Sequence, residues 1–193
     1  LGNGSTTFRP ASVVVSGADR AVRVALGANA SCILRSDGRV LCWGNSLSGF
    51  SETAALVPGL NATTSLGVGQ LHYCAVQGGM VSCWGYNYSR QLGNDLEDGQ
   101  ALPREVAGTS GAVSVAAGDH HTCAVIGRPP ANSVVCWGDN RWGQLGVALP
   151  PTMRSAPAIV PGISNVVRVS VGGRHSCAEM TDTSIRCWGD NSY

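Results

Sequence analysis

The chain contains no lysine, since all 13 of its basic residues are arginines. This absence excludes chemistry that needs a lysine amine, such as Schiff-base formation or a phosphate-loop lysine. Charged residues make up only 13% of the 193 residues, and the net charge is +1. No nucleic-acid partner is therefore expected, because phosphate recognition needs a clustered positive patch.

Long apolar runs and helix-length windows are also missing. No stretch of 18 apolar residues occurs, so we expect no membrane insertion by this segment. The 26 glycines and nine prolines interrupt every window long enough for a helix. No phosphate-binding glycine loop and no G-x-S-x-G elbow occurs. We predict an all-β chain that is not an enzyme and that needs no cofactor.

What the chain has instead is a repeated pair of cysteines. Cys-Trp-Gly occurs four times, and another cysteine precedes each copy. The copies recur at intervals of roughly 40 to 50 residues, which suits one small sheet of three or four strands per repeat, as in a propeller blade. The repeats run approximately over residues 1–50, 51–93, 94–146 and 147–193.

Within each repeat, the two cysteines suit opposite positions of a β-hairpin. A loop over residues 36–38, with Gly38 left-handed, places Cys32 opposite Cys42. A two-residue Gly78-Gly79 turn does the same for the second pair and residues 181–183 for the fourth, whereas the third needs a longer loop around Pro129-Pro130. Directly opposed Cα atoms lie roughly 4.5–5.5 Å apart, which a disulfide bridges. We predict four disulfides: Cys32–Cys42, Cys74–Cys83, Cys123–Cys136 and Cys177–Cys187.

Two alternatives to disulfides remain open at this point. The cysteines would be eight buried free thiols, or they would form four zinc sites, although the spacing lacks the C-x-x-C knuckle typical of zinc. A glycine also stands five residues before the first cysteine of every pair, at Gly27, Gly69, Gly118 and Gly172. Glycine there predicts a tight corner with positive φ.

Four N-x-S/T sequons occur, at Asn3, Asn29, Asn61 and Asn87. Asn61 lies in a variable connection and is the best acceptor for an N-glycan. Asn87 has a competing explanation as a turn residue, because it occupies the repeat position of Asn140. Together with the cysteines, the sequons predict an extracellular glycoprotein from a eukaryotic secretory pathway.

Residues 136–146, Cys-Trp-Gly-Asp-Asn-Arg-Trp-Gly-Gln-Leu-Gly, closely resemble the W-G-x-N-x-x-G-Q-L-G signature of the regulator of chromosome condensation repeat family. Residues 85–93 are a second copy, and residues 189–191 open a third. The first repeat departs, because residues 45–50 lack Gln-Leu-Gly and Ala30 replaces the usual histidine.

The resemblance implies an all-β propeller of such repeats, because members of this family form seven-bladed propellers. The four repeats are then four blades of such a propeller or of a longer array. Both ends fall inside a motif, so we expect the chain to continue into more repeats or to assemble with other subunits. Since the cytosolic and nuclear members of the family are not organised around a cysteine pair in every blade, the chain looks like an extracellular branch of it.

Other residues are weaker candidates for a site. His72, His121 and His175 recur two residues before a cysteine, and we expect a structural hydrogen bond within each blade rather than a metal site. Trp142 is an extra tryptophan in a loop and a candidate contact for a partner protein, with local packing as the alternative. Asp95, Glu97 and Asp98 cluster in one loop; we read them as a solvated turn, with calcium binding as the alternative.

These observations favour a secreted or cell-surface glycoprotein whose propeller binds other proteins or builds an extracellular assembly. Three alternatives follow from the family resemblance. One is the ectodomain of a crinkly-type receptor kinase, and another is a secreted enzyme inhibitor similar to a bacterial β-lactamase inhibitor. The third is a guanine-nucleotide exchange factor, against which the cysteines and sequons argue.

Overall fold

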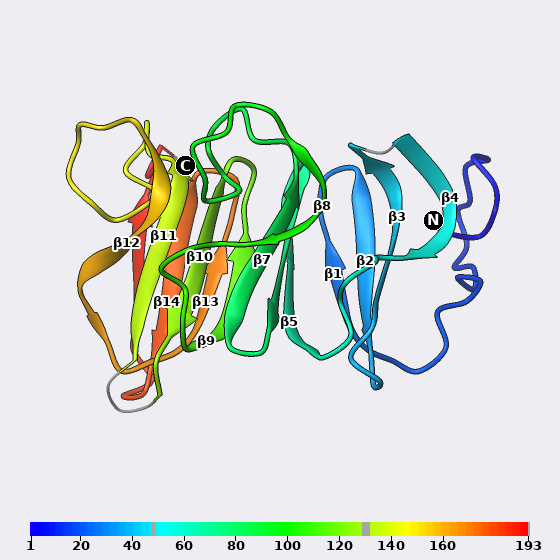
Figure 1. Ribbon diagram of the computed structural model, residues 1–193, viewed down its shortest axis with the longest axis horizontal. Coiled ribbons are helices and arrows are strands. Elements are labelled where there is room, and N and C mark those ends of the chain that lie inside the picture. Colours follow the sequence, from blue (N-terminus) through cyan, green and yellow to red (C-terminus); the bar gives the residue numbers. More distant parts are fainter. Residues whose placement is uncertain (48, 129–131, 193) are drawn as a thin grey trace.

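All regular elements in the described part of the chain are β-strands. The computed structural model describes residues 1–47, 49–128 and 132–192, and these residues form 15 strands in four separate sheets (Figure 1). No helix among them is long and apolar enough to cross a membrane. The predicted all-β propeller architecture is confirmed, and the sheets are called blades 1 to 4 below.

The strands of each blade follow one another along the chain and pair antiparallel with their neighbours. Blade 1 consists of β1 (Ala21–Leu26), β2 (Ala30–Arg35), β3 (Val40–Ser46) and β4 (Gly49–Leu56). Blade 2 consists of β5 (Thr63–Val68), β6 (His72–Gln77), β7 (Met80–Gly85) and β8 (Gln100–Glu105).

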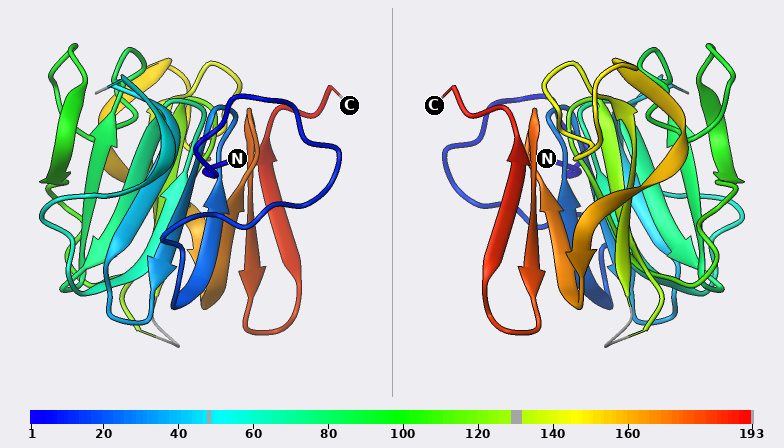
Figure 2. Two further views of the ribbon diagram at one scale, coloured as in Figure 1. Left: turned by 90° about the vertical axis from the view of Figure 1, so that its right-hand side faces the viewer. Right: turned by 90° about the vertical axis from the view of Figure 1, so that its left-hand side faces the viewer.

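Blades 3 and 4 repeat this order, and blade 4 has three strands among the described residues. Blade 3 consists of β9 (Ala112–Ala117), β10 (His121–Ile126), β11 (Ser133–Asp139) and β12 (Met153–Ser164). Blade 4 consists of β13 (Val166–Val171), β14 (His175–Met180) and β15 (Ile185–Gly189). The first strands of successive blades contact one another, β1 with β5, β5 with β9 and β9 with β13, and Figure 2 shows the blades from both sides.

The hairpins between the second and third strands have the predicted turns. Gly38 has φ 77°, Gly78 and Gly79 have φ 58° and 76°, and Thr183 takes the left-handed position of the last turn with φ 69°. Each turn sets the register that places the two cysteines of its blade directly opposite each other. The loop around Pro129-Pro130 lies outside the described residues.

The recurring glycines before the cysteines have a different role from the one predicted. Gly69 and Gly118 do not have positive φ, so the expected left-handed corner is wrong. A Cβ on Gly69 would lie 2.3 Å from Gly118 O in the next blade, and a Cβ on Gly118 would lie 2.4 Å from Gly172 O. Glycine is needed because the backbones of adjacent blades approach too closely for any side chain.

The apolar core lies between the blades, where the sheets pack face to face. Between blades 2 and 3, Val81 and Leu92 cluster with Val115 and Trp137, and all four side chains are buried. A second cluster joins blades 3 and 4, and a third joins blades 1 and 2. Each junction therefore buries apolar surface that a single blade would expose.

The boundaries of the sequence repeats do not coincide with the boundaries of the blades. In blade 2, the loop that carries Gln-Leu-Gly comes after β7, and the chain then returns to add β8 to the same sheet. Strand β8 therefore belongs to the predicted repeat over residues 94–146, although it completes blade 2. In the same way, β12 lies in the repeat over residues 147–193 but completes blade 3.

Candidate functional site

One disulfide joins the second and third strands of every blade. The Cα atoms of each pair are 4.1 Å apart, and no cysteine is free. The alternatives of free thiols and of zinc sites are therefore wrong. The bonds in blades 2 and 3 are fully buried, whereas Cys187 in blade 4 is exposed. The pairs are those that the hairpin register predicts: Cys32–Cys42, Cys74–Cys83, Cys123–Cys136 and Cys177–Cys187.

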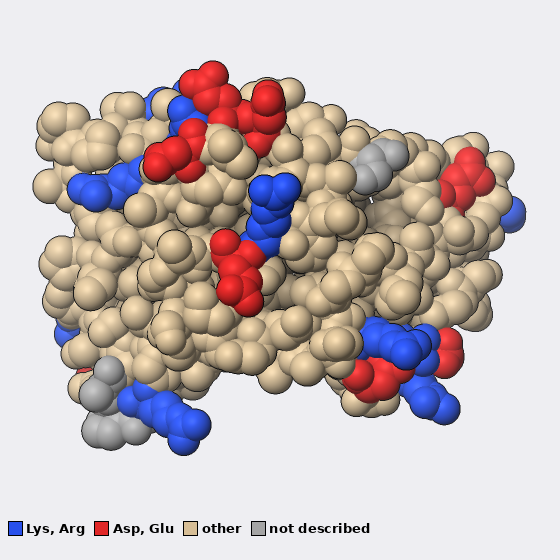
Figure 3. All heavy atoms as spheres, viewed as in Figure 1, with Lys and Arg blue, Asp and Glu red and all other residues tan. Residues whose placement is uncertain are grey.

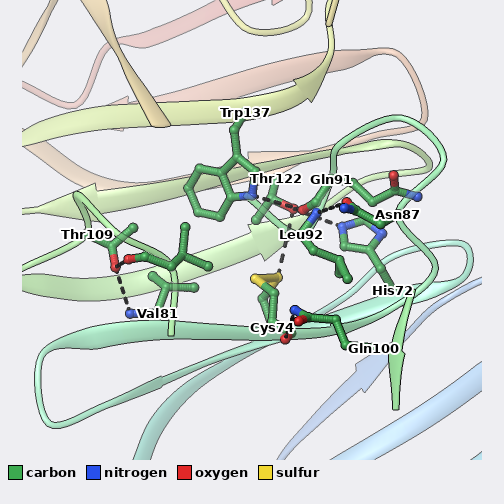
Figure 4. Close-up of a disulfide and its surroundings, with 12 residues drawn as sticks. His72, Cys74, Val81, Asn87, Gln91, Leu92, Gln100, Thr109, Thr122 and Trp137 are labelled. Atoms are coloured by element: carbon green, nitrogen blue, oxygen red, sulfur yellow. Dashed lines mark hydrogen bonds between the residues drawn. A yellow bond between two sulfur atoms is a disulfide. The ribbon is translucent and has the colours of Figure 1, made fainter. Parts of the chain in front are cut away.

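One main-chain carbonyl joins blade 2 to blade 3 (Figure 4). Gln91 O accepts two hydrogen bonds from blade 3, from Trp137 Nε1 and from Thr122 Oγ1, both at 2.9 Å. His72 Nε2 of blade 2 lies 2.8 Å from the same Thr122 Oγ1. Because the threonine hydroxyl gives its only proton to Gln91 O, His72 must donate through a protonated Nε2.

The junction between blades 3 and 4 has the same arrangement. Gln144 O accepts from Trp188 Nε1 and from Ser176 Oγ, again at 2.9 Å each. His121 Nε2 lies 2.9 Å from Ser176 Oγ. The Gln-Leu-Gly motif of one repeat therefore anchors the Cys-Trp-Gly tryptophan of the next blade.

His72 and His121 thus each bridge two blades, so the prediction of a hydrogen bond within each blade is wrong for these two of the three recurring histidines. Burial lowers the pKa of His72 to about 3, and the charge of His121 adds to the effect. Burial likewise lowers the pKa of His121 to about 4, although Asp139 opposes it. Among the described residues, no cluster of His, Cys, Asp or Glu side chains suits a metal ion.

An asparagine holds each motif loop in place. Asn87 Oδ1 accepts a hydrogen bond from Leu92 N at 2.9 Å, and Asn140 Oδ1 accepts one from Leu145 N at 3.1 Å. Asn87 is 0% exposed. A glycan at Asn87 is incompatible with this packing, so the competing explanation as a turn residue applies to this sequon.

The other sequons differ in accessibility. Asn61 lies in the connection between β4 and β5, and Asn29 lies in the turn between β1 and β2; both are exposed. Asn3 is half-buried and pairs with Thr53 of β4. Asn61 and Asn29 are therefore the two sequons that a folded chain presents to solvent.

Trp142 lies at the junction of blades 3 and 4 and is 46% exposed. The guanidinium carbon of Arg174 lies 5.1 Å from the centre of its ring, in a cation–π contact. Its backbone N donates to Gln144 Oε1 at 2.9 Å, as Ser89 N donates to Gln91 Oε1 at 2.8 Å in blade 2. Trp142 therefore packs locally on one side and leaves part of its surface open to a partner.

The acidic loop of blade 2 is held by its own contacts. Arg90 donates to Glu97 Oε1 at 3.0 Å, and Asp95 Oδ1 accepts a hydrogen bond from Ser155 Oγ. The described carboxylates of this loop do not converge on one point. We therefore keep the interpretation of Asp95, Glu97 and Asp98 as a solvated turn.

The junction between blades 1 and 2 differs from the other two. Blade 1 replaces the motif loop by a short connection from β3 to β4, and Asn45 of β3 pairs with Phe50 of β4 next to it. Tyr73 takes the position that Thr122 has in blade 3. Its hydroxyl donates to Asn45 O at 2.6 Å, and its ring stacks on Trp84 with the ring centres 5.4 Å apart.

A pocket of about 320 Å³ lies at this junction. Trp84 and Tyr73 line it together with apolar residues of β4 and β8, among them Leu56 and Leu102. None of its lining residues is charged, and Figure 3 shows charged side chains only in small scattered groups on that view of the molecule. Sequence reasoning did not single out this pocket, although the missing Gln-Leu-Gly of residues 45–50 was the signal for it.

Comparison with known proteins finds the repeat family in this chain. The profile of the regulator of chromosome condensation (RCC1) repeat matches residues 78–125 and 132–178. A second profile with the same description matches residues 21–49 and 166–193. Together the matches cover well over half of the chain.

Individual relatives are longer than this chain. Protein pim1 of Schizosaccharomyces pombe is 30% identical over 199 residues, which cover 86% of this chain and 36% of that protein. Prp20p of Saccharomyces cerevisiae superposes with a TM-score of 0.75 and 26% identity, covering 89% of this chain and 44% of the other. The ectodomain of the receptor kinase CR4 from Physcomitrella patens has a TM-score of 0.57 and 25% identity over 88% of this chain and 41% of the other. The chain spans less than half the length of each.

Proposed function

This chain belongs to the regulator of chromosome condensation (RCC1) repeat family, and we propose that it is a secreted or cell-surface propeller that binds other proteins and does not catalyse a reaction. The observation that carries the proposal is the disulfide in every blade. Disulfides persist in oxidising compartments and are rare in the cytosol and nucleus. A chain that commits all eight cysteines in this way suits the extracellular space.

The protein-binding part of the proposal has two supports. Structures similar to this chain include Prp20p, which was described together with its binding properties to Gsp1p and histones. The second support is the uncharged pocket between blades 1 and 2, because exposed apolar hollows in soluble proteins mark sites of interaction. A protein partner fits a surface of this kind better than a charged polymer does.

The receptor alternative also has an observation in its favour. The likeness to the CR4 ectodomain extends over 88% of this chain. An ectodomain of this class is itself an extracellular propeller, so it is a special case of the proposed function. A membrane-spanning segment encoded downstream in the complete gene is the observation that separates a receptor from a soluble component.

The location is tested on chain isolated from its own cells. Thiol-trapping mass spectrometry without reduction is expected to find no free cysteine, and glycopeptide analysis is expected to find an N-glycan on Asn61 and none on Asn87. Asn61→Gln and Asn87→Gln are the matched variants, of which only the first is expected to lose mass. Eight trapped thiols, or a cytosolic location with no glycan on Asn61 or Asn29, would contradict the proposal.

A further inference from the structure

The pocket between blades 1 and 2 occupies the place that a leucine fills at the other two junctions. Leu92 is 1% exposed and lies in one buried cluster with Trp137, and Leu145 is 0% exposed and belongs to the cluster against which Trp188 packs. Each leucine stands nine residues after the second cysteine of its pair. The residue at that position in the first repeat is Ser51, which lies in β4. Leu47, in the connection between β3 and β4, lines the pocket instead, but it is only partly buried and leaves about 320 Å³ open.

The indole of Trp84 also lacks the partner that its counterparts have. Trp137 Nε1 donates to Gln91 O, and Trp188 Nε1 donates to Gln144 O. Phe50 holds the equivalent position in the first repeat, but it pairs with Asn45 within blade 1 and is 63% exposed. Among the residues that the structure describes, none accepts a hydrogen bond from Trp84 Nε1. Compared with the other two junctions, the pocket therefore lacks the fully buried motif leucine and, among the described residues, a carbonyl acceptor for Trp84 Nε1.

We propose that this pocket binds a neutral loop of a partner protein, with one leucine side chain inside the pocket and a main-chain carbonyl on Trp84 Nε1. The proposal rests on the proposed function and names the chemistry of its partner. Three observations select this occupant. The lining carries no charge, and the volume of about 320 Å³ lies within the roughly 300–1,000 Å³ range of ligand pockets. At the two equivalent sites in the same chain, a buried leucine and the carbonyl of the preceding glutamine take these positions.

The rim of the pocket adds apolar surface for the rest of such a loop. Phe50, Leu56 and Leu102 are 63%, 53% and 56% exposed, and all three line the pocket. This surface is continuous with the apolar cluster that joins the two blades, which contains Val57 and Trp84. A partner that covers the rim would bury a central anchor surrounded by apolar contacts, as protein interfaces commonly do.

The test uses a synthetic peptide with the sequence of residues 139–147, whose arginine and aspartate balance in charge. It is titrated into the full chain carrying ¹⁵N-labelled tryptophan, and Trp84→Phe assigns the indole signal of Trp84. The Trp84 signal is expected to move saturably, while those of Trp137 and Trp188 stay in place. A peptide with aspartate in place of the leucine is expected to bind at least about tenfold more weakly, because a charged side chain cannot enter the uncharged pocket.

Variants of the protein distinguish binding in the pocket from nonspecific binding to other apolar surface. Leu102→Arg at the exposed rim is expected to weaken binding at least about tenfold, whereas Phe8→Arg, at an exposed apolar residue outside the pocket, is expected to leave it unchanged. Trp84→Phe keeps an aromatic ring but removes the N–H donor and part of the indole surface, so calorimetry with it is expected to show weaker binding. A thermal melt of each variant checks that it folds, and Ala101→Arg replaces Leu102→Arg if that variant does not.

The proposal is wrong if the Trp84 signal does not move at millimolar peptide, or if both peptides bind equally well. Equal binding to Leu102→Arg and to the unaltered chain would also overturn it. These failures are distinct from a failure of the proposed function, since disulfides and glycans on material from the native source establish the location whether or not this peptide binds.

Discussion

His72 Nε2 lies 2.8 Å from Thr122 Oγ1, and the hydrogen bond between them crosses from one blade to the next. The imidazole is completely buried, and its Nδ1 has no partner among the described residues. A proton on Nδ1 would place an unpaired charge in the junction. The contact between the two blades therefore requires the neutral form of the ring.

The free energy of unfolding is expected to decrease as the pH falls below about 6.5. The pKa of His72 is lowered from 6.5 to about 3, so between these values the unfolded chain binds more protons than the folded chain. Each pH unit in this window then costs about 1.4 kcal/mol for His72, and His121 acts in the same direction down to about pH 4. Urea denaturation at pH 7, 6 and 5 measures this slope.

Substitution of His72 shows whether this residue causes the slope. His72→Gln is expected to flatten the dependence of stability on pH, whatever it does to stability at pH 7, because the unfolded chain then no longer takes up a proton at this position. An identical slope in His72→Gln and the unaltered chain would show that His72 is not the titrating group.

The motif leucine is expected to contribute several kcal/mol to the free energy of unfolding. Leu145→Ala removes a fully buried side chain from the junction of blades 3 and 4 and is expected to lower the free energy of unfolding by about 2–5 kcal/mol. Leu149→Ala, at a side chain that is 50% exposed, is expected to change it by about 0.5 kcal/mol or less. Urea denaturation of both variants compares them, and similar losses would mean that the junction does not depend on this leucine.

Gly69→Ala tests whether the glycine before the first cysteine of each pair is needed because adjacent blades approach closely there. The new Cβ would lie 2.3 Å from Gly118 O and 2.5 Å from His72 Cε1, so the blades would have to move apart. Gly108→Ala is the matched change, because Gly108 has φ 81° and open space around it, and its cost is about 1–2 kcal/mol from conformation alone. We expect Gly69→Ala to cost more than this in thermal denaturation. A milder effect than that of Gly108→Ala would exclude close packing as the reason for glycine.

Removal of a buried disulfide is expected to destabilise the fold. The double substitution of Cys74 and Cys83 by serine opens the loop that the bond closes and is expected to cost about 2–4 kcal/mol. The same substitution of Cys177 and Cys187 is expected to cost less, because Cys187 is already exposed. Peptide mapping without reduction provides the check on pairing: a peptide that links cysteines of different blades would contradict the hairpin register.

Local sequence determined the hairpins, and contacts between blades determined what the sequence did not reveal. The register of Cys74 and Cys83 follows from a two-residue turn, so residues close in the chain suffice to predict it. The bond of His72 joins residues 50 positions apart and depends on how two sheets stack. Trp84 and Trp137 follow the same Cys-Trp-Gly pattern, yet one lines a pocket and the other is completely buried, because their surroundings come from the preceding repeat.

The offset between repeats and blades has a consequence for how such a chain changes over generations. Strand β8 completes blade 2 but belongs, by sequence, to the unit that builds most of blade 3. A tandem duplication that copies one sequence unit therefore inserts an outer strand for the preceding sheet together with the inner strands of a new one. The new sheet in turn receives its last strand from the unit that follows. Inheritance by whole units keeps every sheet complete, whereas a copy shorter than one unit that omits the segment of β8 would leave one sheet a strand short.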